Sequence, residues 1–196
     1  MDFQLLNLFV FLDKIQVMQT RDFRIVVNEY SSINELPETD VKLLYAAREA
    51  SENAYSPYSK FNVGAAVLLQ NGKIISGNNQ ENSAYPNGLC AERVALFYAN
   101  SKFPDDKVFA IAVSSKNFNG IVSEPISPCG SCRQALMETE VRFKQKIRVI
   151  LDGQQKILVF DGIDNLLPFA FKPNALELKP PLTPPKERKS SPLRGS

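Results

Sequence analysis

The motifs CAER (residues 90–93) and PCGSCRQ (residues 128–134) contain all three cysteines of the chain, and the chain has no histidine. A transition-metal site would therefore have to use these three thiols. A Cys-x-x-Cys pair places two sulfurs on the same side of a tight turn or of a first helical turn, as zinc sites require. Closed structural zinc sites take four protein ligands. Cys90, Cys129 and Cys132 are one ligand short, which predicts a catalytic metal site with an open position.

Glu92 lies two residues from Cys90, where a carboxylate stands beside the metal without binding it. A carboxylate in that place can move a proton to and from a metal-activated water. Leu89 to Ala99 has a helical apolar pattern, and Pro128 heads a second helix, so both motifs are expected at helix N-termini. The partial positive charge of two helix N-termini would offset the negative charge of three thiolates.

Two further segments extend the pattern: SPYSKFNVGAA at residues 56–66 and GNNQENSAYP at residues 77–86. Together with the two cysteine motifs they resemble the small cytidine deaminases that bind zinc through three cysteines, a class of site related to the general zinc deaminase signature. The matching stretches run from about residue 45 to residue 134, with a weaker similarity up to residue 173.

The resemblance implies an α/β fold: a three-layer α/β/α sandwich around a mixed sheet of about five strands. It implies one Zn²⁺ per chain on Cys90, Cys129 and Cys132, and a homotetramer with shared active sites. The implied reaction is attack of zinc-activated water on C4 of cytosine, with release of ammonia and Glu92 as the proton shuttle. Arg93 would donate hydrogen bonds to the ligand sulfurs; its alternative role is a surface salt bridge.

Substrate residues also follow from the resemblance. Asn79 and Glu81 match the pair that binds the ribose 3′-hydroxyl, and a carboxylate there disfavours nucleotides because it would repel a phosphate. Phe61 matches the aromatic that faces the pyrimidine, or else is a plain core residue, and the backbone of Ala91 is expected to contact the base. Tyr85 matches a subunit-interface residue. Phe171, or Phe169 because the spacing departs by one residue, is expected to reach a neighbour's active site.

Three other interpretations are compatible with parts of the sequence. The first is a structural zinc protein or a redox Cys-x-x-Cys couple, which would leave the CAER motif unexplained. The second is a deaminase of a related aminonucleoside, such as a nucleoside antibiotic, against which the Asn79 and Glu81 pair argues. The third is a polynucleotide editor. Basic residues are concentrated in the last 18 positions, and the rest of the chain is slightly acidic, which argues against nucleic-acid binding.

Composition predicts one catalytic domain, over residues 23–178. Residues 1–22 are expected to be an extension that is disordered or not translated, with Met18 as an alternative start. Residues 3–12 are apolar but too short to span a bilayer and lack a basic region before them, so no membrane association is expected. Residues 179–196 are rich in proline and lysine and are expected to be disordered. Three clustered cysteines favour a reducing compartment, the cytoplasm.

The remaining pattern predicts further elements. A helix is expected at about 40–54, with Thr39 or Asp40 as N-cap, and a short helix at 163–167. The expected strands are an edge strand at 23–30, a hairpin of 61–69 with 73–77 around Asn71-Gly72, and strands at 108–114, 147–151 and 156–160.

Overall fold

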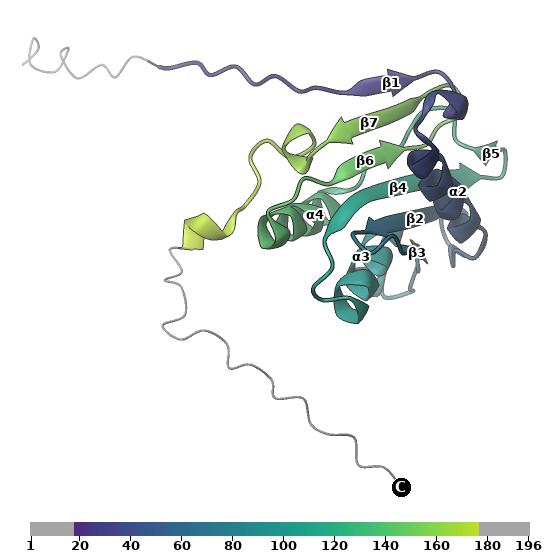
Figure 1. The fold of residues 1–196 in the computed structure, drawn as a ribbon. Coiled ribbons are helices and arrows are strands. Elements are labelled where there is room, and N and C mark those ends of the chain that lie inside the picture. Colours follow the sequence, from purple (N-terminus) through teal and green to yellow (C-terminus); the bar gives the residue numbers. More distant parts are fainter. Residues whose placement is uncertain (1–17, 177–196) are drawn as a thin grey trace, which may run out of the picture.

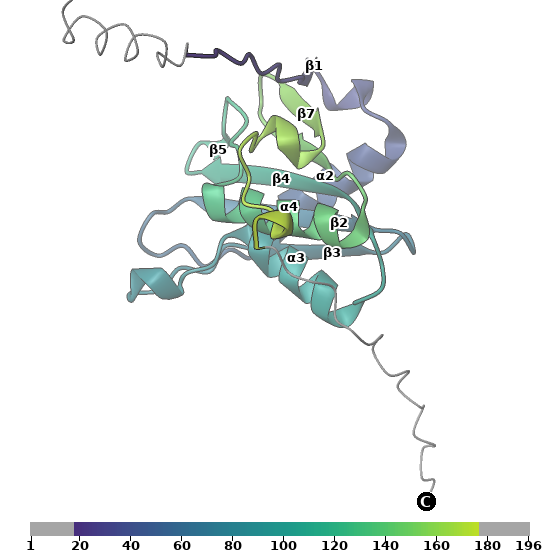
Figure 2. The same cartoon turned by 90° about the vertical axis from the view of Figure 1, so that its left-hand side faces the viewer.

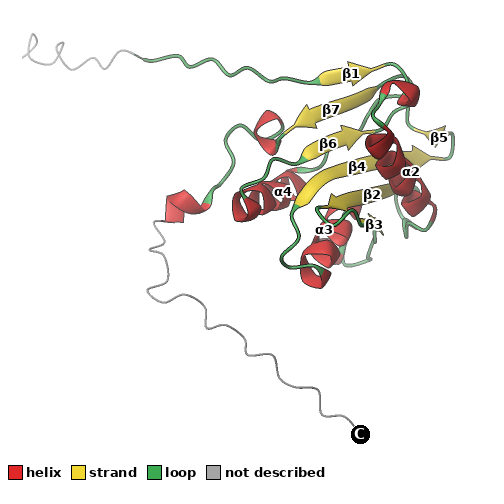
Figure 3. Cartoon of the chain, viewed as in Figure 1, coloured by secondary structure: helices red, strands yellow, loops and turns green. Residues whose placement is uncertain are grey.

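The computed structural model describes residues 18–176, which form a mixed sheet with helices on both faces (Figures 1 and 3). The strands follow the order β1-β7-β6-β4-β2-β3, and β5 pairs with β4 at the side of this path. Only β4 and β6 are parallel neighbours. The strands are β1 (Asn28–Tyr30), β2 (Asn62–Leu69), β3 (Ile74–Asn78), β4 (Val108–Asn117), β5 (Gly120–Ile121), β6 (Arg148–Leu151) and β7 (Ile157–Asp161).

Three α-helices cover the sheet: α2 (Glu38–Glu52), α3 (Ala91–Lys102) and α4 (Gly130–Phe143). Helix α2 packs on one face, and α3 and α4 pack on the other, so the predicted α/β/α sandwich is confirmed. The sheet has seven strands where about five were expected. Two of the seven are short: β1, part of the expected edge strand, places three residues beside β7, and β5, which was not expected, places two beside β4.

The β2–β3 hairpin forms as the Asn71-Gly72 signal predicted, and Gly72 takes a positive φ of 80° in its turn. Two other glycines let helices approach this hairpin from opposite faces. A Cβ on Gly64 would lie 2.0 Å from the Ala47 carbonyl oxygen of α2, and a Cβ on Gly77 would lie 2.5 Å from the Ala95 nitrogen of α3. Both helices are therefore seated directly against the backbone of the hairpin.

Strand β4 divides the core in two, because its alternate side chains face opposite helices. Ile111 and Val113 belong to the larger cluster with α3 and α4, whereas Ala110 and Ala112 belong to the cluster with α2. Val108 and residues 110–115 of β4 are buried, as is typical of a strand that is covered on both faces.

Several expected boundaries differ in the structure. Only residues 28–30 of the expected edge strand at 23–30 pair with β7. Helix α2 begins at Glu38, so Pro37 occupies the N-cap position and neither Thr39 nor Asp40 caps it. Asp40 instead accepts a hydrogen bond of 2.8 Å from Arg148 Nε on β6, a tertiary contact that helix-start rules do not include.

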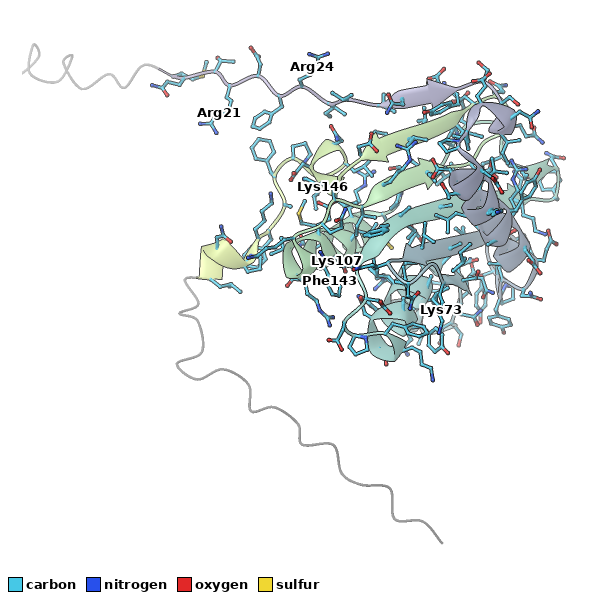
Figure 4. The ribbon with its side chains drawn as sticks, viewed as in Figure 1. Arg21, Arg24, Lys73, Lys107, Phe143 and Lys146 are labelled. Atoms are coloured by element: carbon cyan, nitrogen blue, oxygen red, sulfur yellow. The ribbon has the colours of Figure 1, made fainter. Side chains whose placement is uncertain are left out.

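The segment before β1 runs past the end of β7, with Arg21 and Arg24 along it (Figure 4). Phe23 packs edge-on against Phe169 with ring centroids 4.7 Å apart. The chain after β7 continues through the 3₁₀ turn η3 (Ile163–Asn165), which packs against α4, and then through η4 (Pro173–Leu176) (Figure 2). The expected helix at 163–167 is thus a single short turn.

Within residues 18–176 no helix has the length and apolar character needed to cross a membrane. The predictions for residues 1–17 and for the tail at 179–196 lie outside the described residues.

Candidate active site

Two helix N-termini meet on the face of the sheet that carries α3 and α4. Cys90 is the N-cap residue of α3, and Cys129 is the N-cap residue of α4, with Cys132 in the first turn of the same helix. None of the N-cap side chains closes its own helix with a hydrogen bond, so the free backbone N–H groups and the positive ends of both dipoles face the sulfurs.

The three sulfurs are close enough to share one metal ion. Cys90 Sγ lies 3.8 Å from Cys129 Sγ, which lies 3.4 Å from Cys132 Sγ, and all three fall within 4.8 Å of one another. Thiolates at about 2.3 Å from Zn²⁺ in tetrahedral geometry are about 3.8 Å apart. The donor set therefore fits a zinc ion and, within residues 18–176, leaves a fourth corner without a protein ligand.

Arg93 lies beside this cluster, as predicted from its motif. Its Nη2 donates to Cys90 Sγ at 3.9 Å. Hydrogen bonding to Cys132, and then to Arg93, lowers the pKa of Cys90 to about 5 although burial opposes the shift. Hydrogen bonding to Cys90 together with burial raises the pKa of Cys132. The set thus favours thiolate character at Cys90, the sulfur that Arg93 contacts.

Glu92 is buried, with only 5% of its surface exposed, at the base of a cavity that Cys90 and Cys129 also line. Burial raises the pKa of its carboxyl, and the neighbouring Cys90 thiolate raises it further. Its own backbone N–H, Cys132 and Arg93 offset this only in part. A buried carboxyl that shares a cavity with metal-binding sulfurs has the placement of a general acid or base.

The cavity is about 780 Å³ in volume, which suits a small organic molecule. It brings together residues from five parts of the sequence: the 58–63 segment, the stretch directly after β3, the residues that lead into and begin α3, Val113 of β4, and the loop before α4. Its predicted members are Phe61, Asn79, Glu81, Cys90, Ala91, Glu92 and Cys129.

Asn79 and Glu81 also stabilise the cavity wall. Asn79 Oδ1 accepts from Val63 N at 2.8 Å, and its Nδ2 donates to the Phe61 carbonyl at 3.0 Å. Glu81 Oε2 accepts from the backbone N–H groups of Tyr58 at 2.9 Å and Ser59 at 3.3 Å, and Oε1 accepts from the Ser59 hydroxyl. These contacts, the Ser59 hydroxyl first, lower the pKa of Glu81 and keep it ionised.

Some lining residues had no assigned role in the sequence analysis. Tyr58 and Ser59 belong to the SPYS segment, and Ile126 and Ser127 immediately precede PCGSC. Proximity to a motif is the signal that could have identified them. Phe171 does not line this cavity; it is 59% exposed, and its carbonyl accepts from Gln134 Nε2 at 2.7 Å. Phe169 is 80% exposed despite its contact with Phe23.

Comparisons with known proteins agree with this geometry. Residues 37–145 match the family described as the cytidine and deoxycytidylate deaminase zinc-binding region. A cytidine deaminase from Halalkalibacterium halodurans is 41% identical over 129 residues, which cover 66% of this chain and 91% of that protein. A probable cytidine deaminase from Dictyostelium discoideum is 40% identical over 99 residues, covering 47% of this chain and 60% of that protein.

Solved structures give the same result. The crystal structure of a cytidine deaminase from Burkholderia pseudomallei has a TM-score of 0.56 and 40% identity, and covers 66% of this chain and 97% of its own. The crystal structure of a cytidine deaminase from Mycobacterium tuberculosis has a TM-score of 0.53 and 31% identity. The match covers 67% of this chain and 95% of that chain. With both cysteine motifs and Glu92 inside the matched region, the chain belongs to the zinc-binding family of cytidine and deoxycytidylate deaminases.

Proposed function

We propose that the protein hydrolyses cytidine and deoxycytidine to uridine and deoxyuridine with release of ammonia, as an enzyme of pyrimidine salvage. One observation carries the proposal: three thiols within 4.8 Å of one another lie beside the buried Glu92 in a cavity of nucleoside size. The names of the relatives, cytidine deaminases, support the same substrate class.

Cys90, Cys129 and Cys132 would hold the zinc ion. When bound there, zinc lowers the pKa of a water molecule and so supplies a nucleophile near neutral pH. Arg93 and the two helix N-termini draw negative charge from the thiolates, which three sulfur ligands would otherwise leave on the site.

Glu92 would transfer the protons of the reaction. Its carboxylate would take a proton from the attacking water and deliver it to the ring nitrogen N3 as the new C4–O bond forms. It would then take the proton of the new C4 hydroxyl and pass it to the amine, so that the C4–N bond breaks, ammonia leaves and the C4 carbonyl forms. Because Glu92 lines the cavity and is almost fully shielded from solvent, its burial favours proton transfer within the site over exchange with bulk water.

The ribose would bind to Asn79 and Glu81, which keep hydrogen-bonding capacity after their contacts with the wall. Asn79 Nδ2 has a second N–H beyond the one given to Phe61, and Glu81 Oε1 accepts only from Ser59. A 3′-hydroxyl between them could donate to Glu81 and accept from Asn79. A phosphate at this place would meet an ionised carboxylate, which favours nucleosides over nucleotides.

Phe61 would face the pyrimidine ring, and the backbone of Ala91 would contact the base. Both residues line the cavity. Ala91 is fully buried and follows Cys90 directly, so its backbone lies between the metal ligands and the acid. Phe61 is held by its amide, which donates to Ser59 Oγ at 3.1 Å.

We also propose a homotetramer with shared active sites in the cytoplasm. The surface supports it: Tyr85 is 77% exposed at the cavity rim, and Phe97 and Tyr98 stand out from α3. Phe171 is free to contribute to a neighbour's site because it is exposed and absent from its own cavity. The three cysteines are free thiols, in keeping with a reducing compartment.

The decisive experiment compares the purified wild-type protein with Glu92→Gln, measuring zinc per chain and the loss of cytidine absorbance as uridine forms. Both proteins should hold about one zinc ion, as the three thiols are unchanged. The turnover of Glu92→Gln should fall by about 10³-fold, within the range for loss of a general acid and base.

Glu49→Gln provides the control, because it makes the same chemical change on the exposed surface of α2. It should match the wild type in zinc content and turnover. Zinc binding without turnover of cytidine or deoxycytidine would move the assignment to another aminonucleoside. Absence of zinc in reducing buffer would favour a redox or structural use of the cysteines and would overturn the proposal.

A further inference from the structure

The guanidinium of Arg133 lies where two segments of the chain meet behind the metal-binding loop. Each of its three nitrogens donates one hydrogen bond: Nε to the Pro128 carbonyl at 2.7 Å, Nη2 to Ser127 Oγ at 2.9 Å and Nη1 to the Leu166 carbonyl at 2.9 Å. A planar guanidinium fixes the relative directions of its acceptors, since its donors have a rigid fork geometry.

One of these acceptors, Ser127, belongs to the cavity wall. Ser127 and Cys129 both line the cavity, and Pro128 joins them. Residues 124–129 form no helix or strand, and within the described part of the chain their amides donate no hydrogen bond to a backbone carbonyl, so side-chain contacts contribute most to holding this stretch. The Arg133 amide also donates to the Cys129 carbonyl at 2.9 Å. Backbone and side chain of Arg133 therefore bind three consecutive residues, 127–129.

The third acceptor provides a rigid anchor. Leu166 is 9% exposed and packs in the core, and its own amide donates to the Ile163 carbonyl at 2.8 Å. Glu140 of α4 holds the same turn, because its buried carboxylate accepts from the Ile163 amide at 3.0 Å. Arg133 thus connects an otherwise irregular loop to the packed interior.

We propose that Arg133 is a positioning residue for the metal site, which holds residues 127–129 so that Cys129 Sγ faces the other two sulfurs. Cys129 is the ligand that most needs this support, because it is the exposed member of the three and sits at the helix cap. Arg93 acts differently, since it donates directly to a sulfur. The proposal rests on the zinc site of the proposed function and is independent of the substrate.

The test measures zinc affinity of the full-length protein by competition with a chromophoric chelator. Arg133→Gln should bind zinc about 10- to 100-fold more weakly, as is typical when a residue that orients a metal ligand is lost. Arg133→Lys should recover only part of this loss, because a single ammonium cannot reach three acceptors in fixed directions. Arg142→Gln, on the last turn of the same helix and bonded to the Pro104 carbonyl, is the control and should stay within about two-fold of wild type.

A purely structural role would give a different pattern: lower thermal stability of Arg133→Gln and Arg133→Lys with wild-type zinc affinity, which would overturn the proposal. If Arg133→Gln does not fold, as judged by far-ultraviolet circular dichroism, Ser127→Ala removes one acceptor without touching the core. It should weaken zinc binding several-fold, and unchanged affinity there would also count against the proposal. Weakened zinc affinity in a protein that does not deaminate cytidine would leave Arg133 assigned and overturn only the function.

Discussion

Two buried carboxylates, Asp152 on the α2 face of the sheet and Glu92 on the face with α3 and α4, differ in how they are satisfied. On the α2 face, Asp152 is 1% exposed and saturated: Arg48 donates to both of its oxygens at 2.7 Å, and Ser114 Oγ donates at 2.7 Å. On the face with α3 and α4, Glu92 is buried to a similar degree but opens into the cavity, and burial raises its pKa. A buried carboxylate that is satisfied by a fixed set of hydrogen-bond donors indicates a structural role. A buried carboxyl that lacks such a set and faces a cavity indicates a role in proton transfer.

The largest effect on stability should come from the saturated acid. Asp152→Asn removes the charge that Arg48 faces and should lower the free energy of unfolding by about 2–3 kcal/mol. This cost lies at or below the lower end of the stability loss typical of breaking a buried ion pair, because the Arg48 side chain remains 27% exposed. Urea unfolding followed by circular dichroism, at fixed protein concentration, measures it.

Asp161→Asn is the matched control, since it makes the same change in an exposed pair with Arg148 and should cost less than about 1 kcal/mol. The turnover per folded chain of Asp152→Asn should equal that of the wild type. A loss of turnover without a loss of stability would show that the α2 face takes part in the chemistry, and the contrast between the faces would fail.

The second effect should have the opposite sign. Glu92→Gln replaces a buried ionisable group by a neutral one of the same size and should raise the free energy of unfolding by about 1 kcal/mol, as often happens when a site residue held for function is replaced. The zinc-loaded proteins are compared by the same urea titration, with Glu49→Gln as control. A clear destabilisation would mean that Glu92 has a structural role like that of Asp152.

This contrast also marks what the sequence could predict. The metal ligands, Glu92 and the order of the main helices and strands follow from short motifs and local periodicity, because each of these signals is contained in neighbouring residues. Asp152 carries no such signal: it follows β6, and its partners Arg48 and Ser114 are far away in the sequence. The start of α2 was misplaced for the same reason, since Asp40 is held by Arg148.

The tertiary contacts of the site residues were equally beyond local patterns. Asn79 and Glu81 were expected to bind substrate, and the structure gives them a second task in holding residues 58–63. Arg133 is part of a recognised motif, yet the motif does not reveal that its third acceptor is Leu166. Sequence reasoning identifies which residues carry chemistry, and the fold determines which residues hold them in place.

The smallest effect should come from an acid that has partners but little burial. Asp164 on η3 pairs with Lys146, labelled in Figure 4, and with Lys172 at 3.0 Å, and its side chain is 47% exposed. These lysines, Lys146 first, lower the pKa of Asp164. Because solvent screens such pairs, Asp164→Asn should cost only about 0.5 kcal/mol of unfolding free energy at pH 7.

The pH dependence of this cost follows from the direction of the shift. A carboxyl whose folded pKa is lowered contributes stability above its unfolded pKa and loses it as pH falls through the folded value. The difference between wild type and Asp164→Asn should therefore be the same at pH 5 and pH 8 and should shrink only below the ordinary aspartate pKa of 3.8. It should also shrink in 1 M salt. A loss of unfolding free energy as large as that of Asp152→Asn would contradict this, because it would show that the number of ion-pair partners, and not burial, sets how much a carboxylate stabilises this fold. A loss that changes between pH 5 and pH 8 would also contradict it.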